Sequence, residues 1–304
     1  MKSNAHLSYP EFKEIILSEL KLRFPEASIE SHSVVKNNDT YLDGIYLKRP
    51  GGNIAPQVYL NHFYEDYENE TACLNEIISD ISSVFIENQP VPDVDPEFLS
   101  DFSAIQDRIV FDLISLPRNH DFLSDLPYIS YLDLAIVFRV LIHADDNGRS
   151  SILIHNYHLE DWEVSKETLL DKARQNTPRL LPASIESITD VLGDLTSEEI
   201  LEPSDYTPMY VLSNQCRLNG AACMLYPHLL ERFSREKGMD FYIIPSSIHE
   251  VLLVPAALSG GPEELNAMVQ EVNATELAED EILSEHVYYF SGQRNAVSAS
   301  EGRG

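Results

Sequence analysis

The chain has 304 residues, enough for one large domain or two of ordinary size. Hydrophobic residues make up 43% and charged residues 23%, so a folded core is expected rather than disorder. There are 21 Lys and Arg against 50 Asp and Glu, a formal net charge of −29. This charge repels polyanions and argues against a protein that binds nucleic acid or an anionic membrane surface.

Basic residues are missing from two long stretches, between Arg49 and Arg108 and between Lys237 and Arg294. An acidic surface of this kind keeps a protein soluble. It also attracts a basic partner, and a continuous acidic face can imitate nucleic acid. The sequence favours the first interpretation and leaves the others open.

Cysteine usage and the N-terminus indicate a reducing compartment. Cys73, Cys216 and Cys223 are widely spaced and form no Cys-x-x-Cys pair, which argues against a disulfide framework or a structural zinc site. The first residues lack the apolar segment of a secretory signal, and no apolar run approaches the ~18 residues of a membrane-spanning helix. We therefore expect a cytoplasmic protein, and no motif indicates a cofactor.

The N-terminal part predicts two helices and a small sheet. Ser8 and Glu11 can form a capping box, and apolar residues at helical spacing continue to Pro25. The elements expected next are strands at residues 33–36, 42–47 and 57–60, a turn at 37–39, and a helix at 72–85.

Three prolines within residues 89–96 exclude regular structure there and predict a domain boundary. Residues 292–304 have the composition of a frayed end. The expected organisation is an N-terminal α+β lobe at 1–88, a Pro-rich linker at 89–96, a C-terminal α+β domain at 97–291 and a disordered tail at 292–304.

The C-terminal part alternates hairpins and helices. Asn147 and Gly148 predict a hairpin of residues 134–142 and 151–155, and apolar runs at 241–244 and 251–254 predict another. Further elements are helices at 97–105, 165–176, 220–237 and from Pro262 onward, and strands at 209–212 and 286–290. Hairpins interrupted by helices are typical of an α+β fold with mixed or antiparallel sheets, here in two lobes with packed helices.

Four stretches between residues 35 and 250 resemble one family. They are residues 35–38 with 42–45, 56–61 with Tyr64 and Tyr67, 209–214 with 220–222, and 245–250. On these stretches the chain resembles an uncharacterised bacterial family, a domain of unknown function. The resemblance implies a bacterial, intracellular protein, and it brings no assigned activity, ligand or catalytic residue.

One turn gathers a hydroxyl, an imidazole and a carboxylate, in Ser246, Ser247, His249 and Glu250. A hydrolase needs these groups in contact. On an extended chain Ser247 and His249 lie roughly 6–7 Å apart, too far for a hydrogen bond, and no Gly-x-Ser-x-Gly elbow is present. The alternative is turn chemistry, in which these side chains bond neighbouring backbone, with Asn214 nearby. The turn is the candidate functional segment because it carries more polar groups than a hairpin needs.

His155 and His158, followed by Glu160 and Asp161, suggest a metal site, with His143 as a third imidazole across the hairpin. At a strand end, residues three apart point in opposite directions. Solvated histidines are therefore favoured, and no metal site is predicted.

An aromatic and acidic cluster follows the third predicted strand and includes Tyr59, Asn61, Tyr64 and Tyr67. An aromatic wall edged with carboxylates suits a cationic or peptide ligand, which makes this cluster a candidate ligand or partner surface. The alternative is that the rings pack on the core and leave their polar tips at the surface.

Two classes of function remain. The sequence shows no nucleophile elbow, metal motif or nucleotide loop, which favours a non-enzymatic binding or adaptor module with a protein or small-molecule partner. The alternative is a hydrolase-like enzyme that uses the turn at 246–250 with distant partners such as Asn214 or Asn61.

Overall fold

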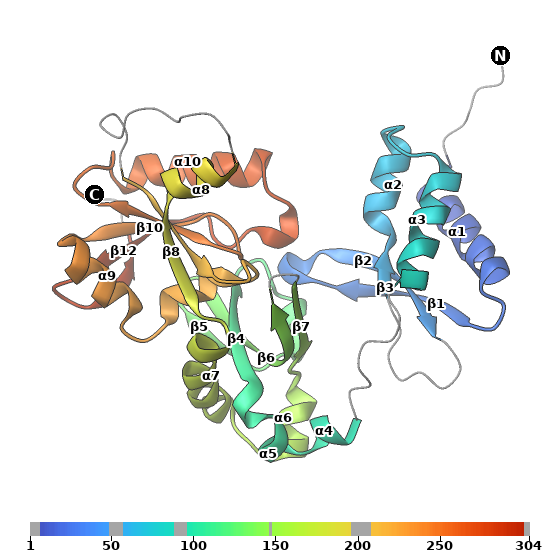
Figure 1. Cartoon of the computed structure of the whole chain (residues 1–304), viewed down its shortest axis with the longest axis horizontal. Coiled ribbons are helices and arrows are strands. Elements are labelled where there is room, and N and C mark those ends of the chain that lie inside the picture. The colour runs from blue at the N-terminus through green and yellow to red at the C-terminus, as the bar shows by residue number, and fades with distance from the viewer. Residues whose placement is uncertain (1–6, 49–56, 88–95, 146–147, 196–207, 301–304) are drawn as a thin grey trace. The chain divides into compact units, whose positions relative to one another are not determined.

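The computed structural model describes residues 7–48, 57–87, 96–145, 148–195 and 208–300 (Figure 1). Contacts between Cα atoms divide the chain into two compact units. One comprises Met1–Lys36 and Thr40–Pro96, and the other comprises Asn37–Asp39 and Glu97–Gly304. Residues 89–95 of the predicted linker lie outside the described residues, and Pro96 begins a short helix.

The N-terminal unit packs three helices on a three-stranded antiparallel sheet, in the strand order β1-β2-β3. Its elements are α1 (Tyr9–Arg23), β1 (Ser28–Val35), β2 (Tyr41–Lys48), β3 (Gln57–Tyr59), α2 (Leu60–Glu68) and α3 (Leu74–Glu87). One apolar core joins helices and sheet, with Phe12 from α1, Ile45 from β2 and Phe85 from α3 fully buried. The sequence-based prediction of α1 is confirmed, because the Ser8 N–H donates to Oε2 of Glu11 at 2.9 Å.

The C-terminal unit contains two antiparallel sheets. The first has β4 (Ile109–Ser115), β6 (Leu134–Asp145) and β5 (Tyr128–Tyr131) in that order, and β7 (Gly148–Leu153) also pairs with β6. The second has the order β13-β12-β10-β11-β9-β8. Its strands are β8 (Ala183–Ser187), β9 (Tyr210–Asn214), β10 (Phe241–Pro245), β11 (Val251–Pro255), β12 (Tyr288–Ser291) and β13 (Ala296–Ala299).

The main core of this unit lies where side chains of the two sheets meet, and it includes Phe111 and Phe138 of the first sheet and Phe241 and Tyr288 of the second. Helix α10 packs on the opposite face of the second sheet, where Val269 meets a separate apolar cluster (Figure 1). The helices of the unit are α4 (Pro96–Ser100), α5 (Phe102–Ile105), α6 (Asn156–Trp162), α7 (Lys166–Leu180), α8 (Ile188–Leu195), α9 (Leu229–Lys237) and α10 (Pro262–Thr275).

These elements make the protein an α+β structure with antiparallel sheets, as predicted. Both predicted hairpins of the C-terminal unit are confirmed as β6–β7 and β10–β11. None of the helices in the described part of the chain is long and apolar enough to span a membrane.

Three local predictions were wrong. The helix expected at 97–105 is interrupted by Asp101, whose carboxylate accepts a hydrogen bond from the Ser103 N–H and so caps α5. The helix expected at 220–237 begins as a 3₁₀ segment, η5 (Gly220–Leu225), and restarts at α9 after Pro227 and His228, which has a left-handed backbone. The expected disordered tail contains β13, which pairs with β12.

Candidate functional site

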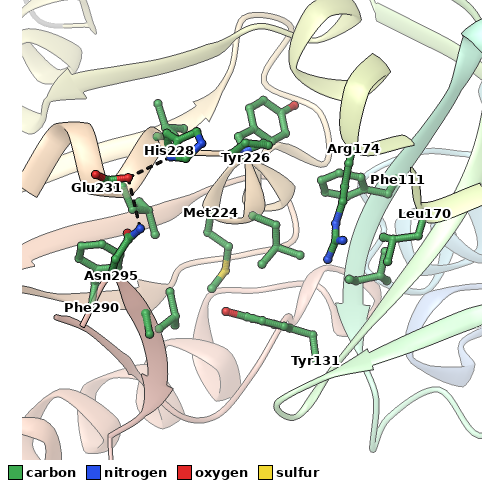
Figure 2. Close-up of a pocket in the computed structure, with 17 residues that line it drawn as sticks. Phe111, Tyr131, Leu170, Arg174, Met224, Tyr226, His228, Glu231, Phe290 and Asn295 are labelled. Carbon is green, nitrogen blue, oxygen red and sulfur yellow. Dashed lines mark hydrogen bonds and ion pairs between the residues drawn. The ribbon is translucent and has the colours of Figure 1, made fainter. Parts of the chain in front are cut away.

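A pocket of about 470 Å³ lies within the C-terminal unit (Figure 2). Both sheets, α7, η5 and the start of α9 contribute to its wall. Most of the wall is apolar, with Phe111, Ile136, Met224 and Phe290 among the lining residues. The polar side chains on the wall are Tyr131, Arg174, Tyr226, His228, Glu231 and Asn295.

The wall at η5 is held by close packing around Gly220. A Cβ atom at this position would lie 2.5 Å from the carbonyl oxygen of His249 and 2.7 Å from the backbone nitrogen of Asn214. The absence of a side chain therefore lets η5 approach β9 and the turn after β10. Further along, the ring of Tyr226 lies edge-on to Phe111, and its hydroxyl donates to the Leu181 carbonyl at 2.8 Å.

One carboxylate of the pocket is already neutralised. Glu231 forms an ion pair with Arg235, and its Oε2 lies 3.0 Å from Nδ1 of His228. Asn295 donates to the same oxygen at 3.2 Å (Figure 2). These contacts lower the pKa of Glu231, led by the hydrogen bond to His228, so the carboxylate stays ionised.

Arg174 and Tyr131 supply the other polar groups. Figure 2 shows both side chains directed into the pocket, Arg174 from α7 and Tyr131 from β5. Among the described residues, neither side chain has a hydrogen-bond or ion-pair partner. Burial raises the pKa of Tyr131, so its hydroxyl remains a hydrogen-bond donor at neutral pH.

A buried ionic cluster lies beside this pocket. Asp112 follows the pocket residue Phe111 on β4 and receives bonds from Arg139 at 2.8 Å and Arg149 at 2.7 Å. Asn219 donates to the same carboxylate at 2.9 Å. Burial by itself raises the pKa of Asp112, but the two arginines outweigh it and hold this pKa below its ordinary value.

The cluster connects to the candidate turn through Asn219. The backbone N–H of Asn219 donates to Nδ1 of His249 at 3.1 Å, and the Ala221 N–H donates to the Ile248 carbonyl. The turn thus contacts η5, which lines the pocket. None of the turn residues 246–250 lines the pocket itself.

Within the turn, the polar groups mostly bond to nearby backbone. The Ser247 hydroxyl accepts the His249 N–H at 3.0 Å, and the Ser247 N–H donates to the Glu250 carbonyl. Ser246 and Glu250 are 3.5 Å apart, and Nε2 of His249 lies 3.5 Å from Glu281. The imidazole ring therefore accepts a backbone N–H on one side and faces a carboxylate on the other.

Asn214 closes the loop after β9. Its Nδ2 donates to the Leu218 carbonyl at 2.8 Å, and its Oδ1 accepts bonds from the Leu218 N–H and the Cys216 thiol. The side chain is almost completely buried. Its polar atoms are thus used to shape the loop that leads into η5.

The aromatic cluster of the N-terminal unit packs around α1. The Tyr64 hydroxyl donates to the Leu7 carbonyl, and the Tyr67 hydroxyl accepts the Leu7 N–H. Asn61 accepts the backbone N–H of Asp43 at 2.9 Å. The ring of Tyr59 carries a cation–π contact with Lys36, whose Nζ lies 4.7 Å from the ring centroid.

The segment predicted as a strand end at residues 155–158 is the start of α6, which corrects that prediction. The reason is a reciprocal cap, in which Nδ1 of His158 accepts the His155 N–H at 2.9 Å. The His155 ring pairs with Asp125, and the His158 ring stacks on Trp162. No group of three or more metal-ligand side chains occurs in the part of the chain that the structure describes.

Sequence reasoning missed the pocket. Its wall comes from segments between Phe111 and Val297, and no short motif includes two of its opposing groups. Arg174 lies within a helix that was predicted, but the sequence does not show that this side chain and Tyr131 line the same cavity. The only local signal is the break at Pro227, which ends η5 before α9 begins.

Comparison with curated proteins and with solved structures finds no match. A family model, described as a family of unknown function (DUF5688), matches residues 9–292. The match extends over most of the chain and includes the turn and all lining residues of the pocket except Asn295, Ala296 and Val297. The chain therefore belongs to this family of unknown function.

Proposed function

We propose that this protein is a non-enzymatic binding module that holds a small molecule in the pocket between the two sheets of its C-terminal unit. The observation that carries the proposal is the pocket wall, which is mostly apolar with a few inward polar groups. Its volume of about 470 Å³ falls within the roughly 300–1,000 Å³ that is usual for small-ligand pockets.

The chemistry of the wall supports binding over catalysis. The described residues that line the pocket include no Ser, Thr or Cys side chain that could act as a nucleophile. The one imidazole, His228, is paired with Glu231, and the Tyr226 hydroxyl is bonded to a backbone carbonyl. A wall of this kind recognises a ligand through shape and a few polar contacts.

A blocking substitution tests the proposal. Ala296 is exposed on β13 and lines the pocket, so Ala296→Trp should fill it at little cost in folding stability. Ala299→Trp is the control, because Ala299 is exposed on the same strand and does not line the pocket. The neutral fluorescent probe N-phenyl-1-naphthylamine should brighten with the wild type and the control and not with Ala296→Trp. Absence of wild-type binding, or equal binding by all three proteins, would refute the proposal.

A further inference from the structure

Of the two charged side chains that line the pocket, Glu231 has ionic partners and Arg174 has none among the described residues. Two charged side chains, Arg174 and Glu231, line it together with His228. Glu231 is paired with Arg235 and also bonded by His228 and Asn295. Arg174 has no ion pair within the described residues, which leaves its guanidinium as the uncompensated charge of the pocket.

An unpaired arginine in this pocket is notable because acidic residues exceed basic ones by 29 in the chain. Seven other arginines of the C-terminal unit have carboxylate or carbonyl partners, namely Arg108, Arg118, Arg139, Arg149, Arg179, Arg217 and Arg235. Among the described residues, the side chains of Arg232 and Arg294 have no such partner either, but neither residue lines this pocket. Arg174 instead extends from α7 into the pocket (Figure 2). Its side chain is exposed, so its charge is hydrated while no ligand is bound.

Tyr131 adds a second donor to the same pocket. Its ring is half-buried on β5 and its side chain is directed into the cavity (Figure 2). Because burial raises its pKa, the phenol keeps its proton and donates without adding negative charge. Beside these two polar groups the wall is apolar, with Phe111, Ile136 and Met224.

We propose that the ligand is a small amphipathic monoanion, a carboxylate on an apolar chain or ring, whose carboxylate is bound by Arg174 and Tyr131. This proposal rests on the proposed function and names its ligand class. A planar guanidinium offers two parallel N–H donors that match the two oxygens of a carboxylate. The apolar body of the ligand would occupy the space against Phe111 and Met224.

Charge favours a monoanion over other classes of ligand. A phosphate dianion would add a second negative charge next to one guanidinium, inside a chain with a net charge of −29. A cationic ligand would face Arg174 and find Glu231 already bonded on both oxygens. A single carboxylate balances Arg174, the one arginine among the described residues that line this pocket.

Three probes with the same ten-carbon chain test the inference, namely decanoate, 1-decanol and decylamine, by titration calorimetry at pH 7.5. Decanoate should bind the wild type roughly tenfold to a hundredfold more tightly than 1-decanol, since hydrogen bonds to charged groups contribute in that range. Decylamine should bind most weakly. Arg174→Gln should remove the preference and keep the affinity for 1-decanol.

Arg232→Gln is the matched control, because Arg232 is also exposed and lines a different cavity of the same unit. It should leave all three affinities unchanged. Tyr131→Phe should weaken decanoate binding without affecting 1-decanol. Equal binding of decanoate and 1-decanol by the wild type, or a preference that survives Arg174→Gln, overturns the ligand class and leaves the proposed function standing. If neither decanoate nor 1-decanol binds, both proposals fail.

Discussion

Replacement of Asp112 by Asn should strongly destabilise the C-terminal unit. The Asp112 side chain is 2% exposed and that of Arg149 is 4% exposed, so this pair is almost free of water. Asn keeps the shape but removes the charge, which leaves the Arg149 cation buried without compensation. Removal of one partner from a buried ion pair costs about 3–5 kcal/mol. Arg139 is less affected, because 26% of its side chain reaches solvent.

Urea unfolding followed by tryptophan fluorescence measures this effect. The single tryptophan, Trp162, belongs to the main core of the C-terminal unit, so its emission reports the unfolding of that unit. The control is Glu186→Gln, which breaks the surface pair with Arg217, whose side chains are 39% and 56% exposed. Exposed pairs contribute about 0–1 kcal/mol. A loss in Asp112→Asn no larger than in Glu186→Gln would refute the reasoning.

The Asp112→Asn variant also tests how the folding stability depends on pH. The pKa of Asp112 is lowered in the folded protein, so the unfolded chain takes up its proton first as the pH falls. The stability that the ionised carboxylate contributes is present above the ordinary value of 3.8 and is lost as the pH falls through the lower folded value. Acid destabilisation below about pH 4 should therefore be shallower in Asp112→Asn than in the wild type.

Three further results are expected. Burial and the nearby His155 lower the pKa of His158, so the unfolded chain binds a proton more readily than the folded one. The free energy of unfolding should therefore decrease as the pH falls below the ordinary His pKa of 6.5, and less so in His158→Gln; the same loss of free energy between pH 7.5 and pH 5.5 in both proteins, measured by urea unfolding, would contradict this. Substitution of His249 by Ala leaves the Asn219 N–H without its acceptor, which should lower the free energy of unfolding by about 1–3 kcal/mol. Thermal melting measures this loss, and an unchanged melting temperature would count against a structural role for the imidazole ring. Gly220→Ala should lower the free energy of unfolding by about 1–3 kcal/mol, because the new Cβ meets rigid backbone. Gly260→Ala is the control, since its Cβ meets only the end of the flexible Glu264 side chain. Equal melting temperatures of the two variants would argue against close packing at η5.

Local features of the fold could be read from the sequence. The capping box of Ser8 and Glu11, the Ser165 cap of α7 and the hairpin of β10 and β11 each depend on groups only a few residues apart. Their hydrogen bonds and backbone angles are set within one turn of chain, so residue type and spacing are sufficient. The α+β class follows from the order of such elements.

Other features depend on packing between distant segments. The fully buried strand β4 is apolar apart from Asp112 and Ser115, and the sequence alone does not show that Arg139 and Arg149 would neutralise Asp112 from β6 and β7. The segment from His155 to His158 is the start of a helix and not the predicted strand end, because the reciprocal cap and the stack of His158 on Trp162 favour the helix.

The sequence by itself determined an acidic chain with an α+β fold, its hairpins and helix starts, and a turn rich in polar groups. Only the tertiary structure decided that this turn contacts η5 through Asn219, and that Arg174 and Tyr131 share a pocket with Phe290. The physical reason is the separation along the chain of the groups that interact. Caps and hairpins are local equilibria, whereas a pocket wall exists only when α7, η5 and both sheets pack together.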